Sequence, residues 1–443
     1  MAILDFPSSP SVGTIYPSPA VTGQPQYTYD GEKWTGGAGV GNVYIADSPP
    51  AAPVGSLWYE SDTGMLYVRY NDGSSTQWVA IPGGASDAVR YGVQTLTTSE
   101  ATQARKNVYA APMDALAYSG MQLNGSMDIG QELGGAARTT GGYICDGWRL
   151  GFGGSMVLSV NQGGGGMFAA NGFPNLIYSS VTTAQPSLGA GDYTQIFNRI
   201  EGYRIARLAW GTANAQPITL GFWTSHFRTG VYGGVVRNLL SDRSYAFTYT
   251  QAASNVPQYN VVTVPGCTTG VWEIGNTTGM DIGFSMGCGT TYTAPSNNTW
   301  LNNNYIAAQG QINAVAATSD VFRLTGVVIL PGLEAPSAAR SPLIMRPYDQ
   351  ELVTCKRYYQ KPFINDLVII ANSYAAGQRF DATYLLPVEM RSAPTMAFSN
   401  ISYNNSSALT ANGANTRSFD IFHTATTAGL SYTGAILTLD ARL

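Results

Sequence analysis

The sequence has 443 residues and a formal net charge of −4, and 11% of its residues are charged, against about 25% in an average soluble domain. This balance offers no basic field for a phosphate backbone, which argues against nucleic-acid binding. The length predicts more than one hydrophobic core. No run approaches the ~20 apolar residues of a membrane span, and residues 1–7 lack the basic start of a signal peptide. We therefore expect synthesis in a cytoplasm, no membrane insertion, and release by lysis if the protein leaves the cell.

Residues 1–82 contain an internal repeat that predicts two β-hairpin modules. In each copy an aromatic strand meets an Asp-Gly turn, at 30–31 and at 72–73, and a Trp begins the return strand. Asp-Gly favours a hairpin because Gly tolerates positive φ. A two-stranded hairpin is marginally stable alone, so we expect these modules to pack on a partner. Three tryptophans are predicted to form the local hairpin cores: Trp34, Trp58 and Trp78.

The same region carries a resemblance to a known family. Residues 1–10 followed by 29–34 resemble the opening of tailed-bacteriophage virion fibre proteins, and 46–73 is similar to a second module of those proteins. The resemblance implies that residues 1–82 attach the chain to other virion proteins.

A short helix is predicted between the N-terminal modules and the rest of the chain. Residues 82–86 are a linker by composition. Thr97 and Glu100 form a capping box, which predicts a helix from about Thr98 to Val108 that ends before 111–112.

The predicted helix has a narrow apolar stripe formed by Ala101, Ala104 and Val108. Three copies around an axis would explain so small a face, and residues 96–107 resemble phage fibre helices that lie near trimer axes. We therefore predict a homotrimer. Residues 121–133 are interpreted as a strand-like neck, so that 83–140 serves as linker and neck.

The central block, 141–332, predicts a β-sandwich. Ile218, Leu220 and Phe222 alternate with less apolar residues, the period of a strand with one buried face, and 245–250 and 282–287 repeat this pattern. Short strands separated by Gly, Asn, Pro and Ser turns favour a sandwich or jelly roll. The fold class predicted for the chain is mainly β.

Further motifs extend the resemblance. Residues 146–148, 199–214 and 230–245 resemble a recurrent sandwich domain of phage fibre and tail proteins, which is often described as similar to carbohydrate-binding modules. Residues 346–361 match the pattern Pro-Tyr-x-x-Glu-Leu-x-x-Cys-x-Arg-Tyr-Tyr of the same family, and 387–395 is similar to its last domain. The resemblance implies a small C-terminal β-domain over 333–443, a place on the virion, and a host cell-surface polysaccharide as partner.

The cysteines give no support for a metal site. They are scattered, with no CxxC pair and no His nearby, and we predict free, mostly buried thiols, with a Cys267–Cys288 bridge left open. No metal or other cofactor is predicted. The four cysteines are Cys145, Cys267, Cys288 and Cys355.

No catalytic residue is predicted either. Residues 283–287 fit G-x-S-x-G, but a nucleophile elbow needs a following helix, and a loop follows here. His226 and His423 both lie in β-like runs. Glu201 is interpreted as structural because arginines flank it. No spacing pairs any two of the central carboxylates for glycoside cleavage; they are Asp192, Glu201, Asp242, Glu273 and Asp281.

Sugar binding needs an aromatic face to stack on a pyranose and amide groups to bond its hydroxyls. The segment 290–304 has this composition, and loops on a rigid scaffold commonly carry recognition. The alternative is that these tryptophans form core or trimer contacts. The candidate glycan-binding residues are Trp300, Asn298, Asn302, Trp223 and Trp272.

Together these features predict a non-enzymatic, trimeric phage fibre or spike that is anchored by its N-terminus and adheres to a host-surface glycan. Two alternatives remain open. One is a purely structural capsid, collar or neck appendage that contacts other virion proteins. The other is a polysaccharide depolymerase, although the sequence lacks the 20–30-residue period of a β-solenoid.

Overall fold

The computed structural model describes residues 6–19, 26–36, 43–81, 95–108, 120–164, 166–361 and 367–443. The chain packs as two compact units, Met1–Ala110 and Ala111–Leu443. The predicted linker at 82–86 and the predicted helix end at 111–112 lie outside the described residues. No helix within the described ranges is long and apolar enough to cross a membrane.

The first N-terminal module is a three-stranded sheet of β1 (Ile15–Tyr16), β2 (Tyr27–Tyr29) and β3 (Trp34–Gly36). The β2–β3 hairpin turns at Asp30, whose Oδ1 accepts hydrogen bonds from the main-chain N–H groups of Glu32 and Lys33, at 2.9 and 2.8 Å. Phe6 stacks on Trp34 with ring centroids 4.8 Å apart. The predicted hairpin and its Trp core are confirmed.

The second module is larger than the predicted hairpin. It contains β4 (Val43–Ala46), β5 (Leu57–Glu60), β6 (Leu66–Asn71) and β7 (Thr76–Ala80), and β4 pairs with β5 in parallel. Strands β6 and β7 form the predicted hairpin at Asp72, whose Oδ1 accepts from the N–H groups of Ser74 and Ser75. Trp58 is buried and lies against Tyr67 and Trp78, at centroid distances of 4.7 and 5.6 Å.

Helix α1 (Thr98–Asn107) begins with the predicted capping box. The main-chain N–H of Thr97 donates to Glu100 Oε2 at 2.7 Å, and the N–H of Glu100 donates to Thr97 Oγ1 at 3.3 Å. The Thr97 hydroxyl also donates to Glu100 Oε2 at 2.7 Å, and this bond together with the one from the Thr97 N–H holds the pKa of Glu100 below its usual value. Ala101 and Ala104 are half-buried and Val108 is exposed.

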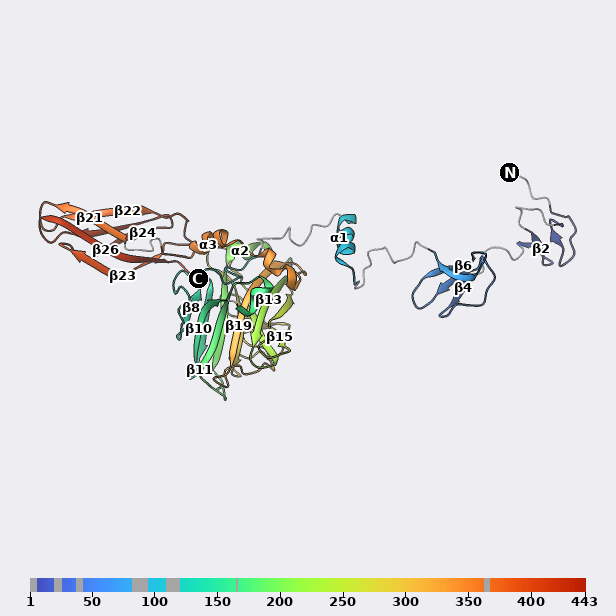
Figure 1. Cartoon of the computed structure of the whole chain (residues 1–443), viewed down its shortest axis with the longest axis horizontal. Helices are drawn as coiled ribbons and strands as arrows, with labels where there is room; N and C mark the ends of the chain where they lie inside the picture. The colour runs from blue at the N-terminus through green and yellow to red at the C-terminus, as the bar shows by residue number, and fades with distance from the viewer. Residues whose placement is uncertain are drawn as a thin grey trace. The chain divides into compact units, whose positions relative to one another are not determined.

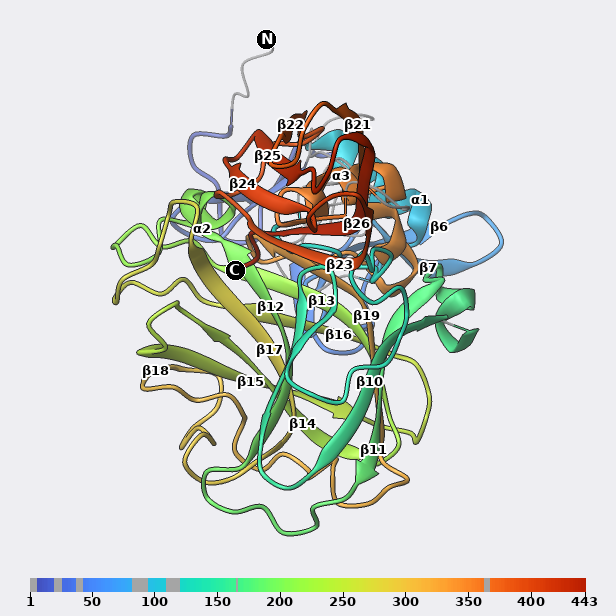
Figure 2. The same cartoon turned by 90° about the vertical axis from the view of Figure 1, so that its left-hand side faces the viewer.

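The second unit contains a β-sandwich of two antiparallel sheets, which pack face to face (Figures 1 and 2). The seven-stranded sheet runs in the order β18 (Trp300–Asn302), β15 (Arg243–Gln251), β14 (Gly230–Arg237), β17 (Thr278–Cys288), β12 (Tyr193–Glu201), β9 (Trp148–Gly153), β8 (Gly142–Cys145). The five-stranded sheet runs in the order β10 (Val157–Gly164), β11 (Asn175–Thr183), β19 (Val321–Pro331), β13 (Ile218–His226), β16 (Gln258–Val264). Short helical turns lie between some of the strands. The turn η2 (Gly166–Asn171) follows β10, and α2 (Gly202–Ile205) and η3 (Ala206–Leu208) follow β12.

The main core lies between these two sheets and confirms the alternating pattern on their inner faces. Phe222 of β13 meets Phe284 of β17 with ring centroids 4.9 Å apart. Trp148 is fully buried, and its indole N–H donates to the main-chain oxygen of Asn124 at 3.0 Å.

The prediction that β13 has one buried face is wrong, because all nine of its residues are buried. A segment that follows the sandwich covers the second face of this sheet. The indole N–H of Trp223 donates to Ser341 Oγ at 2.9 Å, and Ile344 packs against Val328 and Leu330. Ser341 and Ile344 belong to η4 (Ala338–Ile344).

The prediction of a strand-like neck over 121–133 is also wrong. This segment has no strand, and it is packed into the second unit, where Met121 and Met127 join the core between the sheets. Asn124 and Met127 have positive φ values of 52° and 59°, which turns the chain away from an extended path. The Asn124 side chain fixes the turn because its amide N–H groups donate to the main-chain oxygens of Ile129 and Asp146.

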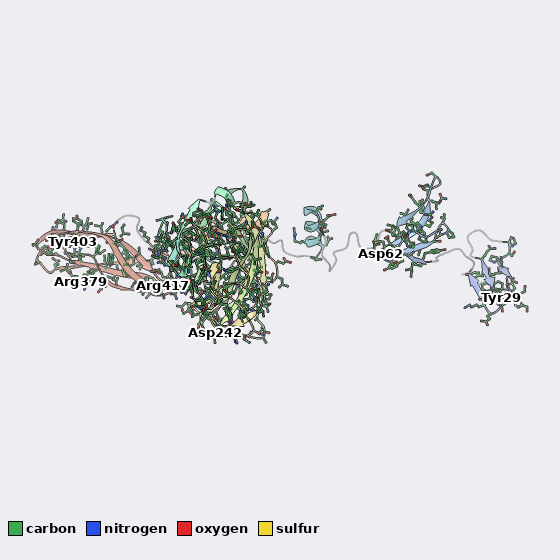
Figure 3. All side chains as sticks on the ribbon, turned by 90° about the horizontal axis from the view of Figure 1, so that it is seen from below. Tyr29, Asp62, Asp242, Arg379, Tyr403 and Arg417 are labelled. Carbon is green, nitrogen blue, oxygen red and sulfur yellow. The ribbon has the colours of Figure 1, made fainter. Side chains whose placement is uncertain are left out.

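The C-terminal β-domain begins after α3 (Tyr348–Lys356) (Figure 1). It has its own apolar core around Phe419, Ile421 and Leu437. Arg379, Tyr403 and Arg417 project from this domain (Figure 3). The strands are β20 (Tyr359–Gln360), β21 (Leu367–Ser373), β22 (Arg379–Leu385), β23 (Thr395–Asn404), β24 (Thr410–Ala414), β25 (Ser418–Thr424) and β26 (Gly429–Asp440).

The cysteines are free thiols, and three of the four are buried, as predicted. Burial raises the pKa of the Cys288 thiol to about 11. The domain boundaries predicted at 82, 140 and 332 stay predictions.

Candidate functional site

A groove of about 390 Å³ lies on the outer face of the seven-stranded sheet, over β9, β12, β17 and β14. Its volume falls in the range of about 300–1,000 Å³ that is usual for small-molecule sites. The groove is lined by Gly141, Gly142, Arg149, Leu150, Gly151, Phe152, Tyr193, Gln195, Phe197, Arg199, Arg237, Leu239, Ser241 and Asp281.

The strand register places the polar lining residues in rows across the sheet. Arg199 of β12 pairs with Asp281 of β17, and Asp281 pairs on its other side with Arg237 of β14. Gln195 of β12 pairs with Gly151 of β9. Side chains two residues apart on one strand point to the same face, so these groups all face away from the core.

Two glycines, Gly151 and Gly283, leave space above the outer face of the sheet because they have no side chain. A Cβ atom at Gly151 would lie 3.2 Å from the Phe197 ring, and one at Gly283 would lie 3.0 Å from Gln195 Oε1. Side chains at these two positions would compete for the space that Gln195 and Phe197 occupy. The glycines therefore leave room above the sheet.

The groove is electrostatically positive. Asp281 Oδ2 accepts from the Arg237 guanidinium at 3.3 Å, and Asp281 Oδ1 lies 3.5 Å from Arg199 Nε. Burial raises the pKa of Asp281 and lowers that of Arg237, while the neighbouring arginines oppose the rise at Asp281. Three guanidinium groups thus line the groove with one carboxylate.

Aromatic rings hold two of these arginines. The Arg149 guanidinium lies 5.0 Å from the centroid of Tyr143 and 5.6 Å from that of Phe197. Arg199 lies 5.6 Å from the same Phe197 centroid. Such contacts are worth about 0.5–1 kcal/mol at exposed sites and fix the plane of the guanidinium.

Several polar atoms of the groove have no hydrogen-bond partner among the described residues. The buried atoms are Arg149 Nε, Arg199 Nε, Arg237 Nε, Gln195 Oε1 and Asp281 Oδ1. Buried polar groups are usually satisfied, so this concentration of unpaired donors and acceptors marks a place where an external polar partner fits.

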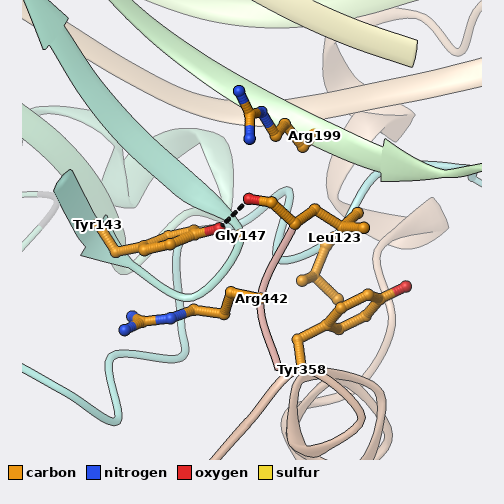
Figure 4. A pocket seen from close by; sticks show the side chains of 7 residues that line it. Leu123, Tyr143, Gly147, Arg199, Tyr358 and Arg442 are labelled. Carbon is orange, nitrogen blue, oxygen red and sulfur yellow. Dashed lines mark hydrogen bonds between the residues drawn. The ribbon is translucent and has the colours of Figure 1, made fainter. Parts of the chain in front are cut away.

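A small cavity adjoins the groove and shares Arg199 with it (Figure 4). The Tyr143 hydroxyl crosses this cavity and donates to the main-chain oxygen of Leu443 at 2.6 Å. With about 10 Å³ it is the size of one water molecule at most, so it cannot hold a sugar.

The predicted glycan-binding tryptophans do not line the groove. Trp223 and Trp272 are each 6% exposed, and Trp223 lines a separate hollow of about 460 Å³ beside Gly172 and Pro342. Contact of these two residues with a glycan stays a prediction. Trp223 lies on the five-stranded sheet, near η4. Trp272 and Trp300 do come together, in a cluster with Trp210, at centroid distances of 4.6 to 5.6 Å.

Trp300 is the third predicted tryptophan, and its role as a stacking platform stays a prediction. It is half-buried against the main core, its indole N–H donates to the Pro265 oxygen at 2.8 Å, and its ring lies 5.3 Å from that of Tyr245. Asn298 and Asn302 are exposed, and Asn302 Oδ1 accepts from Arg243. Their contact with a glycan stays a prediction.

The G-x-S-x-G segment and the two histidines considered for catalysis lie in strands, namely β17, β13 and β25. Residues 283–287 lie within β17, where Ser285 Oγ accepts from Gln311 Nε2 at 3.0 Å. His226 is buried between the rings of Tyr232 and Phe322, and burial lowers its pKa to about 3. No group of three or more His, Cys, Asp or Glu residues in the described part of the chain is placed to hold a metal ion.

Comparison with known proteins shows weak structural likeness only. No family model and no curated protein matches the sequence. The enzymatically active domain of tailspike protein 4 from bacteriophage CBA120 is similar with a TM-score of 0.25 and 10% identity, over 48% of this chain and 22% of that one.

Two structures from Clostridium thermocellum are similar at the same level. A family 11 carbohydrate-binding module in complex with a β-1,3-1,4-linked tetrasaccharide has a TM-score of 0.24 and 9% identity, over 45% of this chain and 99% of that one. Xylanase 10B modules complexed with xylohexaose have a TM-score of 0.24 and 12% identity, over 47% of this chain and 30% of that one. At these scores the likeness carries no argument about what this chain does.

Proposed function

We propose that the protein binds a glycan in the groove on the seven-stranded sheet. The groove itself carries the proposal: it is open, of suitable volume, and lined by an aromatic ring, planar guanidinium groups and an amide. Tyr193 offers a ring to a pyranose face, and Arg149, Arg199 and Gln195 offer hydrogen bonds to its substituents. Together these groups suit a polyhydroxylated ligand.

We further propose that the glycan belongs to a host surface and that the chain is a fibre or spike of a tailed phage. The support is the motif resemblance over residues 1–10, 29–34, 46–73, 199–214, 230–245 and 346–361. In this proposal the N-terminal modules attach the chain to the virion, and the chain forms a homotrimer. Binding without cleavage is the proposed activity, because the described residues that line the groove include one carboxylate, whereas glycosidases use two.

Replacing Tyr193 with alanine is expected to lower the affinity for a bound glycan about tenfold, because the substitution removes the ring from the groove. Binding of the full chain to a glycan array, followed by titration with a glycan that it retains, measures the effect. The matched control is Tyr178→Ala: Tyr178 is a half-buried tyrosine on β11 of the other sheet, under the Arg323 guanidinium. If both variants lost the same glycan affinity, or if neither lost any, the result would contradict a glycan site in the groove.

Removing residues 1–82 is expected to leave a folded trimer that no longer enters virions, because those residues form small modules within the first unit. Light scattering should give about three times the mass of the truncated chain, and three times 47.0 kDa for the full chain. Truncated protein found on purified virions would show that another part of the chain attaches it. A monomeric mass would contradict the proposed homotrimer.

A further inference from the structure

We infer that the groove selects a glycan that carries carboxylate groups, so that the ligand is an acidic polysaccharide. This inference rests on the proposed function, since it names the class of glycan that the same groove would take. Its basis is the charge of the lining residues: three arginines and one aspartate leave two positive charges in excess. The whole chain, by contrast, has a net charge of −4.

The excess charge is carried mainly by Arg149 and Arg199. Arg149 makes no ion pair or hydrogen bond with the described residues, and its guanidinium is held by the rings of Tyr143 and Phe197. Arg199 reaches Asp281 at 3.5 Å, which is beyond a good hydrogen bond, and its side chain is 30% exposed. Both guanidinium groups therefore retain donors for a ligand.

Asp281 cannot neutralise all three arginines. The carboxylate of Asp281 makes its shorter contact with Arg237. Arg237 is buried and also donates to Asn304 Oδ1. The Arg237–Asp281 ion pair therefore forms one wall of the groove, and it leaves Arg237 Nε and Asp281 Oδ1 without hydrogen-bond partners. The two remaining guanidinium groups each lie 5.6 Å from the centroid of the Phe197 ring.

The arginines next to the groove are neutralised, which confines the excess to the groove. Arg442 pairs with Asp440 and Glu132, and Arg138 pairs with Glu132 at 3.0 Å. A concave site with an excess of one sign of charge concentrates ions of the opposite sign. A planar guanidinium also matches a planar carboxylate through two parallel hydrogen bonds, which a hydroxyl group cannot reproduce.

A glycan array with neutral, sulfated, uronate-containing and sialylated members tests the inference on the full, wild-type chain. We expect the retained glycans to carry carboxylates, and we expect amidation of those carboxylates to lower binding at least about tenfold. Retention of neutral or only sulfated glycans would overturn the carboxylate inference while leaving the proposed function in place. Retention of none would overturn the proposed function itself.

Variants then locate the selecting charges on the best retained acidic glycan. Arg149→Gln and Arg199→Gln should each weaken binding about tenfold, and Asp281→Asn should strengthen it, because removing the negative charge raises the local potential. Arg323→Gln is the matched control, since Arg323 lies over Tyr178 on the opposite sheet and donates to Asn255. Unchanged affinity in both groove variants would overturn the inference.

Discussion

Replacing Glu201 with alanine is expected to lower the free energy of unfolding by about 3 kcal/mol, because the substitution leaves buried donors without an acceptor. Glu201 is 2% exposed. Its two carboxylate oxygens accept from Arg357 Nε at 2.9 Å and Nη2 at 2.6 Å, and the Tyr358 hydroxyl donates to Oε2 at 2.7 Å. These bonds connect the end of β12 to the segment after α3, 156 residues away.

Thermal unfolding of the full chain measures this loss. The estimate is at the lower end of about 3–5 kcal/mol for breaking a buried pair, because the Arg357 side chain is 31% exposed and regains some hydration. The control is Glu389→Ala, which breaks an exposed ion pair with Arg417 and should leave the free energy of unfolding nearly unchanged. Equal losses in the two variants would contradict the account of Glu201.

Replacing Trp300 with alanine is expected to destabilise the sandwich by about 2–3 kcal/mol, somewhat less than the ~3–5 kcal/mol for a fully buried Trp. The change removes ring contacts with Trp210, Trp272 and Tyr245. It also leaves the Pro265 oxygen without the indole donor. Glycan affinity of the folded variant should stay unchanged, since Trp300 does not line the groove.

Melting temperature and glycan titration on the same variant separate these effects. Tyr374→Ala serves as the control, because this aromatic residue is 90% exposed and its removal should leave stability nearly unchanged. If Trp300→Ala kept the wild-type melting temperature and lost glycan binding, Trp300 would instead be the stacking platform that its loop composition predicts.

The features that could be predicted from the sequence are those fixed by local chemistry. The Asp-Gly turns at Asp30 and Asp72 and the capping box at Thr97 each depend on residues within a few positions. The mainly β class follows from the alternation of apolar residues along the sequence. The free cysteines follow from their scattered spacing. The structural role of Glu201 was inferred from flanking arginines, whereas its partners are Arg357 and Tyr358.

The features that could not be predicted depend on contacts between distant segments. Residues 121–133 alternate like a strand, but Asn124 in a left-handed conformation bends them into the core. Trp223 packs against Phe168 of η2 and Ser341 of η4. Trp272 packs against the rings of Trp210 and Trp300, and all these partners are distant in the sequence. A usable signal for the groove was present in β12, where Gln195, Phe197 and Arg199 share one face, but only the register with β9, β14 and β17 brings their partners together.

The central claim is that a glycan lies in the groove, and its most direct test is the position of an array-selected oligosaccharide in a crystal structure of its complex with the full chain. The account predicts sugar density over β9, β12 and β17, with Arg149 and Arg199 within hydrogen-bond distance of the ligand and Tyr193 beneath a pyranose face. Sugar density confined to another surface, such as the loop 290–304, with the groove unoccupied would contradict it.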